Sequence, residues 1–316
     1  MREAANLSEA GDRSINWKAK ALLQRCLSRC PLGLQVNYLL QRYVQRSLPL
    51  DERAVREVAE LATSHLDALR DHLPKQPQQA VCLEIGAGTD LALPLLLYSQ
   101  GVNRQITIDI TVLARRVLVN SAIASLRSLD LPLRRPPAAM IGRCEDLRGA
   151  LRAHYGIDHL APRDARHTRL PSNSIDFIHS TNTMEHIPPA DLPLILGECR
   201  RLLAPAGLLS LYIDYRDHYS YADRGISVYN FLQYSDAAWS PFNSSLQYQN
   251  RLRHPDYLEL AGKCGFRILS ERRVAPSDTD RRLLRRLELD ARFRRYDCED
   301  LAVQGAHLVM AAKPGC

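Results

Sequence analysis

A strand that runs into a glycine turn constrains the fold of this chain more than any other feature. The strand is Val81–Ile85, and Gly86-Ala87-Gly88 follows it. Because glycine has no Cβ, a backbone with this spacing can pass close to a ligand. The carboxyl end of a parallel strand is also where open α/β sheets bind nucleotides. The turn therefore predicts a nucleoside-containing ligand on Gly86 to Gly88.

Strands and helices alternate along the chain from residue 80 onward. We expect helices near residues 91–100, 112–126, 147–155 and 190–203, and strands at 80–85, 105–109, 157–161, 175–180, 208–213, 266–270 and 307–312. Strands that alternate with helices form a mostly parallel sheet, which helices cover on both faces. We therefore predict an α/β domain over residues 78–316.

The first 77 residues have a different pattern. Apolar residues recur at helical spacings over residues 14–75, and Pro31, Pro49 and Pro74 interrupt them. This pattern predicts an N-terminal helical cap, at 1–77, of two to four helices. The first, over residues 17–34, is basic and amphipathic. Such a helix either packs on the domain or touches a membrane surface.

The composition excludes some classes of protein and leaves others open. No apolar run approaches the roughly 20 residues of a membrane span, and the polar segment 1–13 lacks the apolar core of a secretory signal. Eight scattered cysteines without a C-x-x-C pair are typical of reduced thiols, so we expect a cytoplasmic protein. The net charge is +7, and arginines cluster within residues 281–295. That cluster is either a solvated helix face or a surface for nucleic acid or anionic membranes.

The spacing of the glycine turn separates two kinds of nucleotide site. A dinucleotide fingerprint reads G-x-G-x-x-G, but Leu91 stands at the third position, and Glu84 comes two residues before Gly86. Asp109, which ends the next strand 21 residues after Gly88, can accept hydrogen bonds from both ribose hydroxyls. The turn thus departs from the NAD-binding pattern, although an NAD-dependent enzyme stays as an alternative.

Further motifs follow the glycine turn in a fixed order. They are Asp164-Ala165, Leu170-Pro171, the strand Ile175-Asp176-Phe177, the pair Glu185-His186 before Pro188, a turn at 200–207, and Gly265-Phe266. With the E-x-G-x-G turn, they resemble the class I S-adenosylmethionine-dependent methyltransferases over roughly residues 78–313. The resemblance implies a transferase with a Rossmann-like three-layer sandwich, a mostly parallel seven-stranded sheet, and S-adenosyl-L-methionine as its cofactor. Insertions at about 127–156 and 215–252 depart from the family's length.

The same resemblance assigns roles to individual residues. Glu84 corresponds to the acid at the cofactor's amino-acid end, while Gly86 and Gly88 let the backbone pass beneath it. Asp109 corresponds to the ribose ligand and Asp164 to the acceptor of the adenine amino group. Asn182 belongs to the segment near the sulfur. A rival acidic pair, Glu145-Asp146, lies in the first insertion, and we prefer Asp164 because it precedes the Leu-Pro block at close to the family's distance.

Two histidines are candidates for a catalytic base. His218 follows Asp214 by four residues, and His186 follows Glu185 in the family motif. Imidazole titrates near neutrality, and a carboxylate beside it can orient it. We rank His218 ahead of His186, which is more often a wall residue. Relatives that bind a divalent ion here have a second acid where this chain has Asn182, a poorer ligand, so no metal is expected.

The acceptor is less constrained by the sequence. Ten aromatic residues within 212–248 predict either a lid that walls the acceptor or the core of a helical subdomain. The strand at 175–180 lacks the Asn/Asp-Pro-Pro motif of nucleobase amino methylases, so nucleic acid is not the expected acceptor. We expect a small-molecule, sugar or lipid-linked acceptor, methylated at oxygen. The alternative from another class is a protein that binds nucleic acid or anionic surfaces through the basic C-terminal helix.

Overall fold

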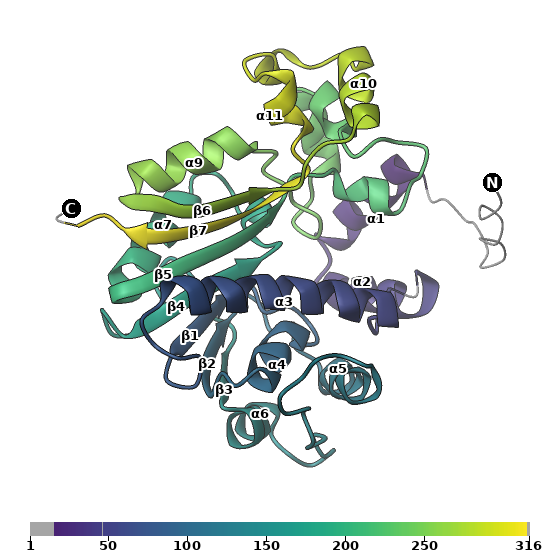
Figure 1. Ribbon diagram of the computed structural model, residues 1–316. Coiled ribbons are helices and arrows are strands. Elements are labelled where there is room, and N and C mark those ends of the chain that lie inside the picture. The colour runs from purple at the N-terminus through teal and green to yellow at the C-terminus, as the bar shows by residue number, and fades with distance from the viewer. Residues whose placement is uncertain (1–15, 46, 315–316) are drawn as a thin grey trace, which may run out of the picture.

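The computed structural model describes residues 16–45 and 47–314. Seven strands form one sheet in the order β3-β2-β1-β4-β5-β7-β6 (Figure 1). Their bounds are β1 Val81–Ile85, β2 Arg104–Ile108, β3 Ile157–Leu160, β4 Ile175–Thr181, β5 Leu203–Asp214, β6 Phe266–Arg273 and β7 Gly305–Ala312. All pairings are parallel except those of β7, which runs antiparallel to β5 and β6. The predicted α/β sandwich with a mostly parallel seven-stranded sheet is confirmed.

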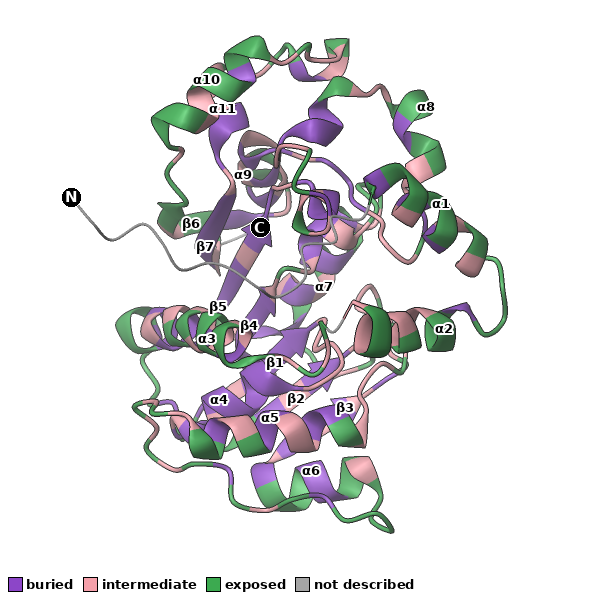
Figure 2. Ribbon diagram, turned by 90° about the vertical axis from the view of Figure 1, so that its right-hand side faces the viewer, coloured by how far each residue is buried: buried purple, intermediate pink, exposed green. Residues whose placement is uncertain are grey.

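Helices cover both faces of the sheet because successive strand residues point to opposite sides. On one face, Cys82 and Phe177 pack in one core with α3 (Glu52–His72), α4 (Ala92–Ser99), α5 (Arg116–Ser128) and α6 (Leu147–Tyr155). On the other face, Leu83 and Ile178 pack with α7 (Leu192–Leu202) and α9 (His254–Lys263). Figure 2 shows the resulting layers, with the buried sheet between helices whose outer sides are exposed. No helix in the described part of the chain is long and apolar enough to cross a membrane.

The N-terminal region differs from its prediction in one respect. The expected single helix over 17–34 is instead two, α1 (Trp17–Leu27) and α2 (Gly33–Leu39), and α2 continues into the π-helical turn η1 (Leu40–Val44). The break falls where Pro31, which has no N–H, follows the C-cap Ser28. The long α3 that follows packs in the main core. The domain boundary at residue 77 stays a prediction, and segment 1–13 lies outside the described residues.

A third core joins the N-terminus to the insertion after β5. Trp17 lies among the rings of Tyr219, Tyr234, Trp239 and Phe242, at centroid distances of 4.9 to 5.8 Å. The insertion and the segment after β6 form short helices: η3 (His218–Tyr221), η4 (Asn230–Gln233), α8 (Asp236–Trp239), η5 (Ser240–Phe242), α10 (Asp278–Arg286), η6 (Ala291–Phe293) and α11 (Cys298–Ala302). The aromatic strip is therefore mainly a subdomain core, and it fixes α1 in place.

Candidate active site

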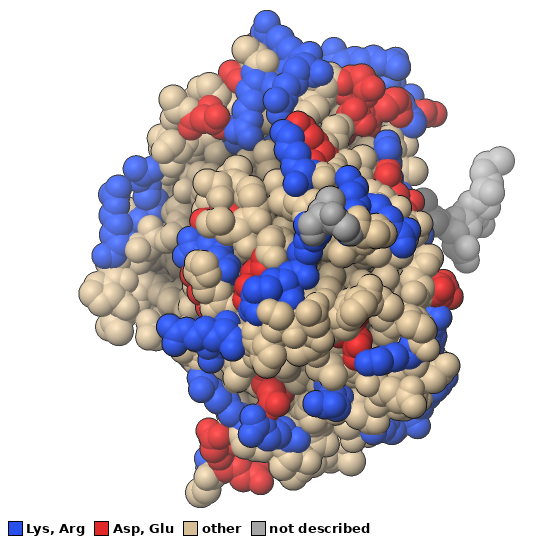
Figure 3. Space-filling view, turned by 90° about the vertical axis from the view of Figure 1, so that its left-hand side faces the viewer, with Lys and Arg blue, Asp and Glu red and all other residues tan. Residues whose placement is uncertain are grey.

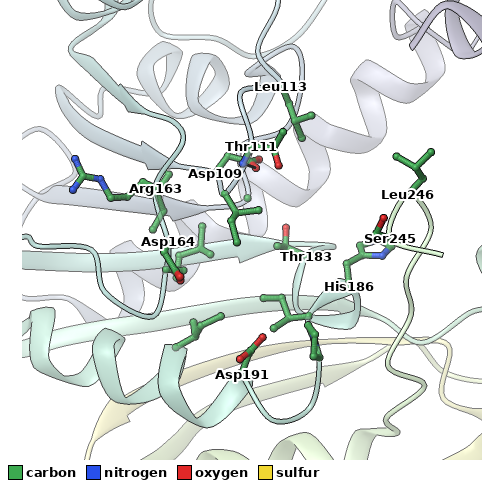
Figure 4. Close-up of a pocket in the computed structure, with 18 of the residues that line it drawn as sticks. Asp109, Thr111, Leu113, Arg163, Asp164, Thr183, His186, Asp191, Ser245 and Leu246 are labelled. Atoms are coloured by element: carbon green, nitrogen blue, oxygen red, sulfur yellow. Dashed lines mark hydrogen bonds between the residues drawn. The ribbon is translucent and has the colours of Figure 1, made fainter. Parts of the chain in front are cut away.

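A cavity of about 510 Å³ opens where β1, β2 and β4 end. Its walls come from the glycine turn, the loop after β2, the loop after β3 and the turn η2 (Met184–His186) after β4, together with α2 and residues 245–246. In Figure 4, Asp109 and Asp164 lie on one side of the cavity and His186 and Ser245 on the other. The strand ends thus meet at one edge of the sheet, where a nucleoside site was predicted.

The two glycines leave room for a ligand in different ways. Gly86 has a φ of +84°, and a Cβ there would lie 2.3 Å from the Thr183 hydroxyl oxygen. Gly88 has a φ of +71°, and its missing Cβ points into open space. Both conformations favour glycine, since L side chains rarely adopt them. Leu91, at the position of the absent third glycine, also has a positive φ, of 54°.

The two carboxylates expected to bind the nucleoside both line the cavity. Asp109 accepts a hydrogen bond from the Thr111 amide at 3.1 Å, and burial raises the pKa of its carboxyl. Asp164 accepts hydrogen bonds from the Arg166 guanidinium, which holds its pKa below the ordinary value. Arg166 also pairs with Asp191 at 2.8 Å. Asp164 is therefore an ionised acceptor in a fixed position.

Glu84 lies in the strand behind the turn and not in the cavity wall. It is 3% exposed, and its Oε2 has no hydrogen-bond partner. Burial, together with the charges of Asp90 and Asp109, raises its pKa to about 8. A buried carboxyl in this state favours a nearby cation, which would stabilise its ionised form.

Other predicted residues lie outside the cavity wall. Asn182 is exposed with a φ of 48°, and its backbone amide donates to the Tyr212 carbonyl. Of the rival acids, Asp146 caps α6 by accepting from the Gly149 amide, and Glu145 accepts from the Gly142 amide. Both serve local structure, whereas Asp164 faces the cavity.

The two candidate histidines have different positions. His186 lines the cavity, and its Nδ1 lies 2.6 Å from the Tyr248 carbonyl oxygen. Since a carbonyl only accepts, Nδ1 carries the proton, and Nε2 of the neutral ring is a free acceptor. Burial and the neighbouring His218 lower the pKa of His186 to about 4. His218 is 9% exposed and packs behind His186, with ring centroids 4.8 Å apart.

A polar cluster surrounds His218. Asp214 accepts hydrogen bonds from Arg216 and Tyr221 and lies 3.5 Å from the His218 Nε2. Burial raises the pKa of Asp214, but His218 and Arg216 more than offset this effect and hold it below the ordinary value. Glu185 is buried, and neither of its carboxylate oxygens has a hydrogen-bond partner. Burial raises its pKa well above the ordinary value. Asp214 is therefore the ionised acid of the pair.

One set of side chains in the described part of the chain has the arrangement of metal ligands. Glu185, His186 and His218 each bring one ligand atom to within 4.8 Å of the others. The sequence singled out all three, but only the turn after β4 and the turn after β5 bring them together.

The sequence did not predict the far wall of the cavity. Leu34, Asn37 and Gln41 line it from the N-terminal cap, and Ser245 and Leu246 line it from the insertion. None of the ten aromatic residues in 212–248 lines the cavity, so the expectation that their rings wall the acceptor is wrong. The five residues of the far wall carried no recognisable signal in the sequence, because they belong to no motif and face the cavity only through tertiary packing, such as that of Tyr38 in α2 on Arg115.

The strand ends, the glycine turn and the two acids are together typical of a Rossmann-like enzyme that binds a nucleoside cofactor at this edge of the sheet. A family model of a methyltransferase domain matches residues 51–271, which is more than half of the chain. The chain therefore belongs to the methyltransferase-domain family, and it is an enzyme that uses S-adenosyl-L-methionine as its methyl donor. No curated protein sequence matches it.

Solved structures are similar in fold at low sequence identity. One is a putative sarcosine dimethylglycine methyltransferase from Galdieria sulphuraria, 16% identical, with a TM-score of 0.46 over 84% of this chain and 87% of that one. Another is the 1,6-didemethyltoxoflavin-N1-methyltransferase of Burkholderia thailandensis with bound S-adenosylhomocysteine, 13% identical, with a TM-score of 0.44 over 98% and 93%. A third is an S-adenosylmethionine-dependent methyltransferase from Mesorhizobium loti, 14% identical, with a TM-score of 0.45 over 81% and 99%.

The residues at the strand ends fit this cofactor. The turn at Gly86 has no room for a side chain, and the space beside Gly88 is open for a ligand. Asp109 and Asp164 both line the cavity, where Asp109 would offer carboxylate oxygens to a ribose and Asp164 to an adenine amino group. The unpartnered Oε2 of Glu84 lies behind the turn, where it favours a cationic group.

Proposed function

We propose that this enzyme transfers a methyl group to a hydroxyl oxygen of a small-molecule or lipid-linked acceptor, with His186 as the general base. The observation that carries the proposal is the contact of the His186 Nδ1 with a backbone carbonyl, from which the tautomer of the ring follows. Its Nδ1–H donates to the Tyr248 carbonyl at 2.6 Å, so its Nε2 lone pair is free in a cavity-lining residue. An alcohol acceptor benefits from such a base by typically about 10²–10⁴-fold.

The protein's own groups prepare this proton transfer. When bound, S-adenosylmethionine supplies an activated methyl group on its sulfonium. His186 is neutral above a pKa of about 4, so it is in its basic form at neutral pH. As it accepts the hydroxyl proton, the ionised Asp214 stabilises the positive ring, an interaction that favours protonation of His186. His218 fills the space behind His186 and positions its ring.

The far wall of the cavity indicates the kind of acceptor. Leu34 and Leu246 are apolar, whereas Asn37, Gln41 and Ser245 carry neutral polar groups. Amide and hydroxyl groups orient a ligand through hydrogen bonds, and the leucines accommodate its apolar part. This mixture suits a neutral molecule that has both hydroxyl groups and an apolar portion.

Measured release of S-adenosylhomocysteine with a panel of acceptors tests the proposal. Hydroxylated small molecules, sugars and lipid alcohols are compared with their matched amines, and mass spectrometry locates the new methyl group. We expect turnover with a hydroxyl compound and none with its methyl ether, which has no proton to lose. Methylation confined to nitrogen or carbon would overturn the oxygen assignment while leaving the methyltransferase class intact.

A further inference from the structure

The helices that precede α3 have an apolar surface without a partner. Helix α1 packs on the protein through Trp17, Ala21 and Gln24, which are one helical turn apart and buried. Its neighbouring face carries Leu22 and Leu23, 49% and 50% exposed. Further exposed apolar residues follow on α2 and η1, which are Leu32, Leu34, Val36, Leu39, Tyr43 and Val44. Figure 2 shows α1 and α2 with mainly exposed outer sides.

This surface, which we call the α1–η1 surface, has charge of only one sign. Residues 16–45 contain Lys18, Lys20, Arg25, Arg29 and Arg42 and no aspartate or glutamate. Among the described residues, none of the five forms an ion pair. Exposed leucines beside cations that have no acidic partner are the pattern of a helix that lies in the interface of an anionic membrane.

The other arginine-rich segment provides an internal comparison. Residues 276–300 hold seven arginines, at 281, 282, 285, 286, 292, 294 and 295, but also seven acids, at 278, 280, 288, 290, 297, 299 and 300. Arg281 pairs with Glu299 at 2.8 Å, and Arg295 pairs with Asp256 at 2.9 Å. At the top of Figure 3, where α10 and α11 lie, basic and acidic side chains are intermixed. This segment therefore lacks the single-sign field that the α1–η1 surface has.

The α1–η1 surface reaches the mouth of the cavity. Leu34 is 45% exposed and also lines the cavity, as does Ile110, which is 67% exposed in the loop after β2. Val112, 59% exposed, lies with Leu34 along a neighbouring groove. The rim of the cavity thus carries exposed apolar side chains beside α2, so a bilayer in contact with this surface would lie near the cavity opening.

We propose that the α1–η1 surface binds an anionic lipid bilayer. Its leucines insert among the acyl chains near the headgroups, and its lysines and arginines contact the lipid phosphates. Binding strength then depends on both apolar area and anionic lipid, since each contributes to interfacial binding. Membrane binding does not depend on the chemistry proposed for His186, because His186 takes no part in it.

Co-sedimentation of the full chain with vesicles tests the proposal. We expect binding to phosphatidylcholine vesicles that contain phosphatidylglycerol, much weaker binding to phosphatidylcholine alone, and weakening as salt is raised. The double variant Leu22→Ser/Leu23→Ser should lower partitioning about tenfold or more, and Lys18→Glu/Arg29→Glu should do so on anionic vesicles only. The matched control Leu283→Ser alters a leucine, 42% exposed, on the arginine-rich α10 and should leave binding unchanged.

Circular dichroism and S-adenosylhomocysteine binding confirm that each variant is folded. Equal binding by the double leucine variant and the parent, or no binding to anionic vesicles, would overturn the proposal. Size-exclusion chromatography tests the alternative that a second copy of the chain, and not a bilayer, occupies this surface. A dimer that Leu22→Ser/Leu23→Ser dissociates, together with absent vesicle binding, would make this surface a subunit interface instead.

Discussion

The two ends of the cavity are built in different ways. At the cofactor end, Gly86 and Asp109 stand directly after β1 and β2, and Asp164 lies in the loop that follows β3 of the same sheet. At the acceptor end, α2 and residues 245–246 come from the two regions that lie outside the sheet, and Trp17 packs the N-terminal helix α1 against the insertion. The difference indicates that cofactor binding depends on a rigid local scaffold, whereas acceptor binding depends on long-range packing.

The largest expected effect separates chemistry from cofactor binding. His186→Ala removes the free Nε2 and should lower kcat by about 10²–10⁴-fold, because the acceptor loses its base. S-adenosylhomocysteine affinity, measured by calorimetry, should stay within about twofold, since the strand-end contacts remain. The exposed His72→Ala is the matched control. A kcat equal to that of the parent would refute the role of His186.

At the cofactor end, Gly86→Val should lower S-adenosylhomocysteine affinity about 10²-fold, because the new side chain collides with Thr183 at a positive φ. Gly197→Ala, at a helical glycine with open space around it, should change nothing. Thermal melts of both variants distinguish a lost site from a lost fold. Parent-like affinity in a folded Gly86→Val protein would place the cofactor elsewhere.

Asp109→Asn removes the charge from the expected ribose contacts. Hydrogen bonds to charged groups contribute about 1.5–3 kcal/mol each, so affinity for S-adenosylhomocysteine should fall about tenfold to a hundredfold. The exposed Asp130→Asn serves as control and should bind as the parent does. If the two variants behave alike in calorimetry, Asp109 does not contact the ligand.

The two ends should also respond to pH in different ranges. Glu84, with a pKa of about 8, becomes ionised as pH rises from 7 to 9, so affinity for the cationic S-adenosylmethionine should increase, by up to about tenfold. Glu84→Gln should remove this increase, since only the ligand's own titration remains. His186 stays neutral until pH falls toward 4, so kcat should fall only in acid. An increase in affinity that persists in Glu84→Gln would exclude this carboxyl as its source.

The smallest expected effect lies in the packing that joins α1 to the insertion. Trp17→Ala removes the ring that packs on Trp239 and Phe242 and should loosen α2, which raises the KM for the acceptor about fivefold. S-adenosylhomocysteine affinity should not change. Tyr43→Ala, at an aromatic residue 66% exposed, is the control. Loss of cofactor affinity in Trp17→Ala would show that the two ends are not independent.

Much of the cofactor end could be predicted from the sequence, because its residues are fixed by short-range rules. The turn at Gly86, the acid Asp109 and the strand positions follow from local spacing, and all seven strands form where they were expected. The break between α1 and α2 was missed, since helical periodicity continues across Pro31. The wall made by Asn37 and Leu246 was missed because neither residue belongs to a motif.

The sequence by itself determined the class of this protein: a glycine turn and strand-end acids require only neighbours along the chain and in adjacent strands. The tertiary structure alone decided which histidine faces the cavity and what surrounds the acceptor. His186 and Tyr248 are 62 residues apart, and their hydrogen bond exists only because the insertion folds back on the turn after β4. Likewise, Trp17 packs on aromatic rings more than 200 residues away in the sequence. That contact positions α1, and with it the basic and apolar α1–η1 surface beside the cavity.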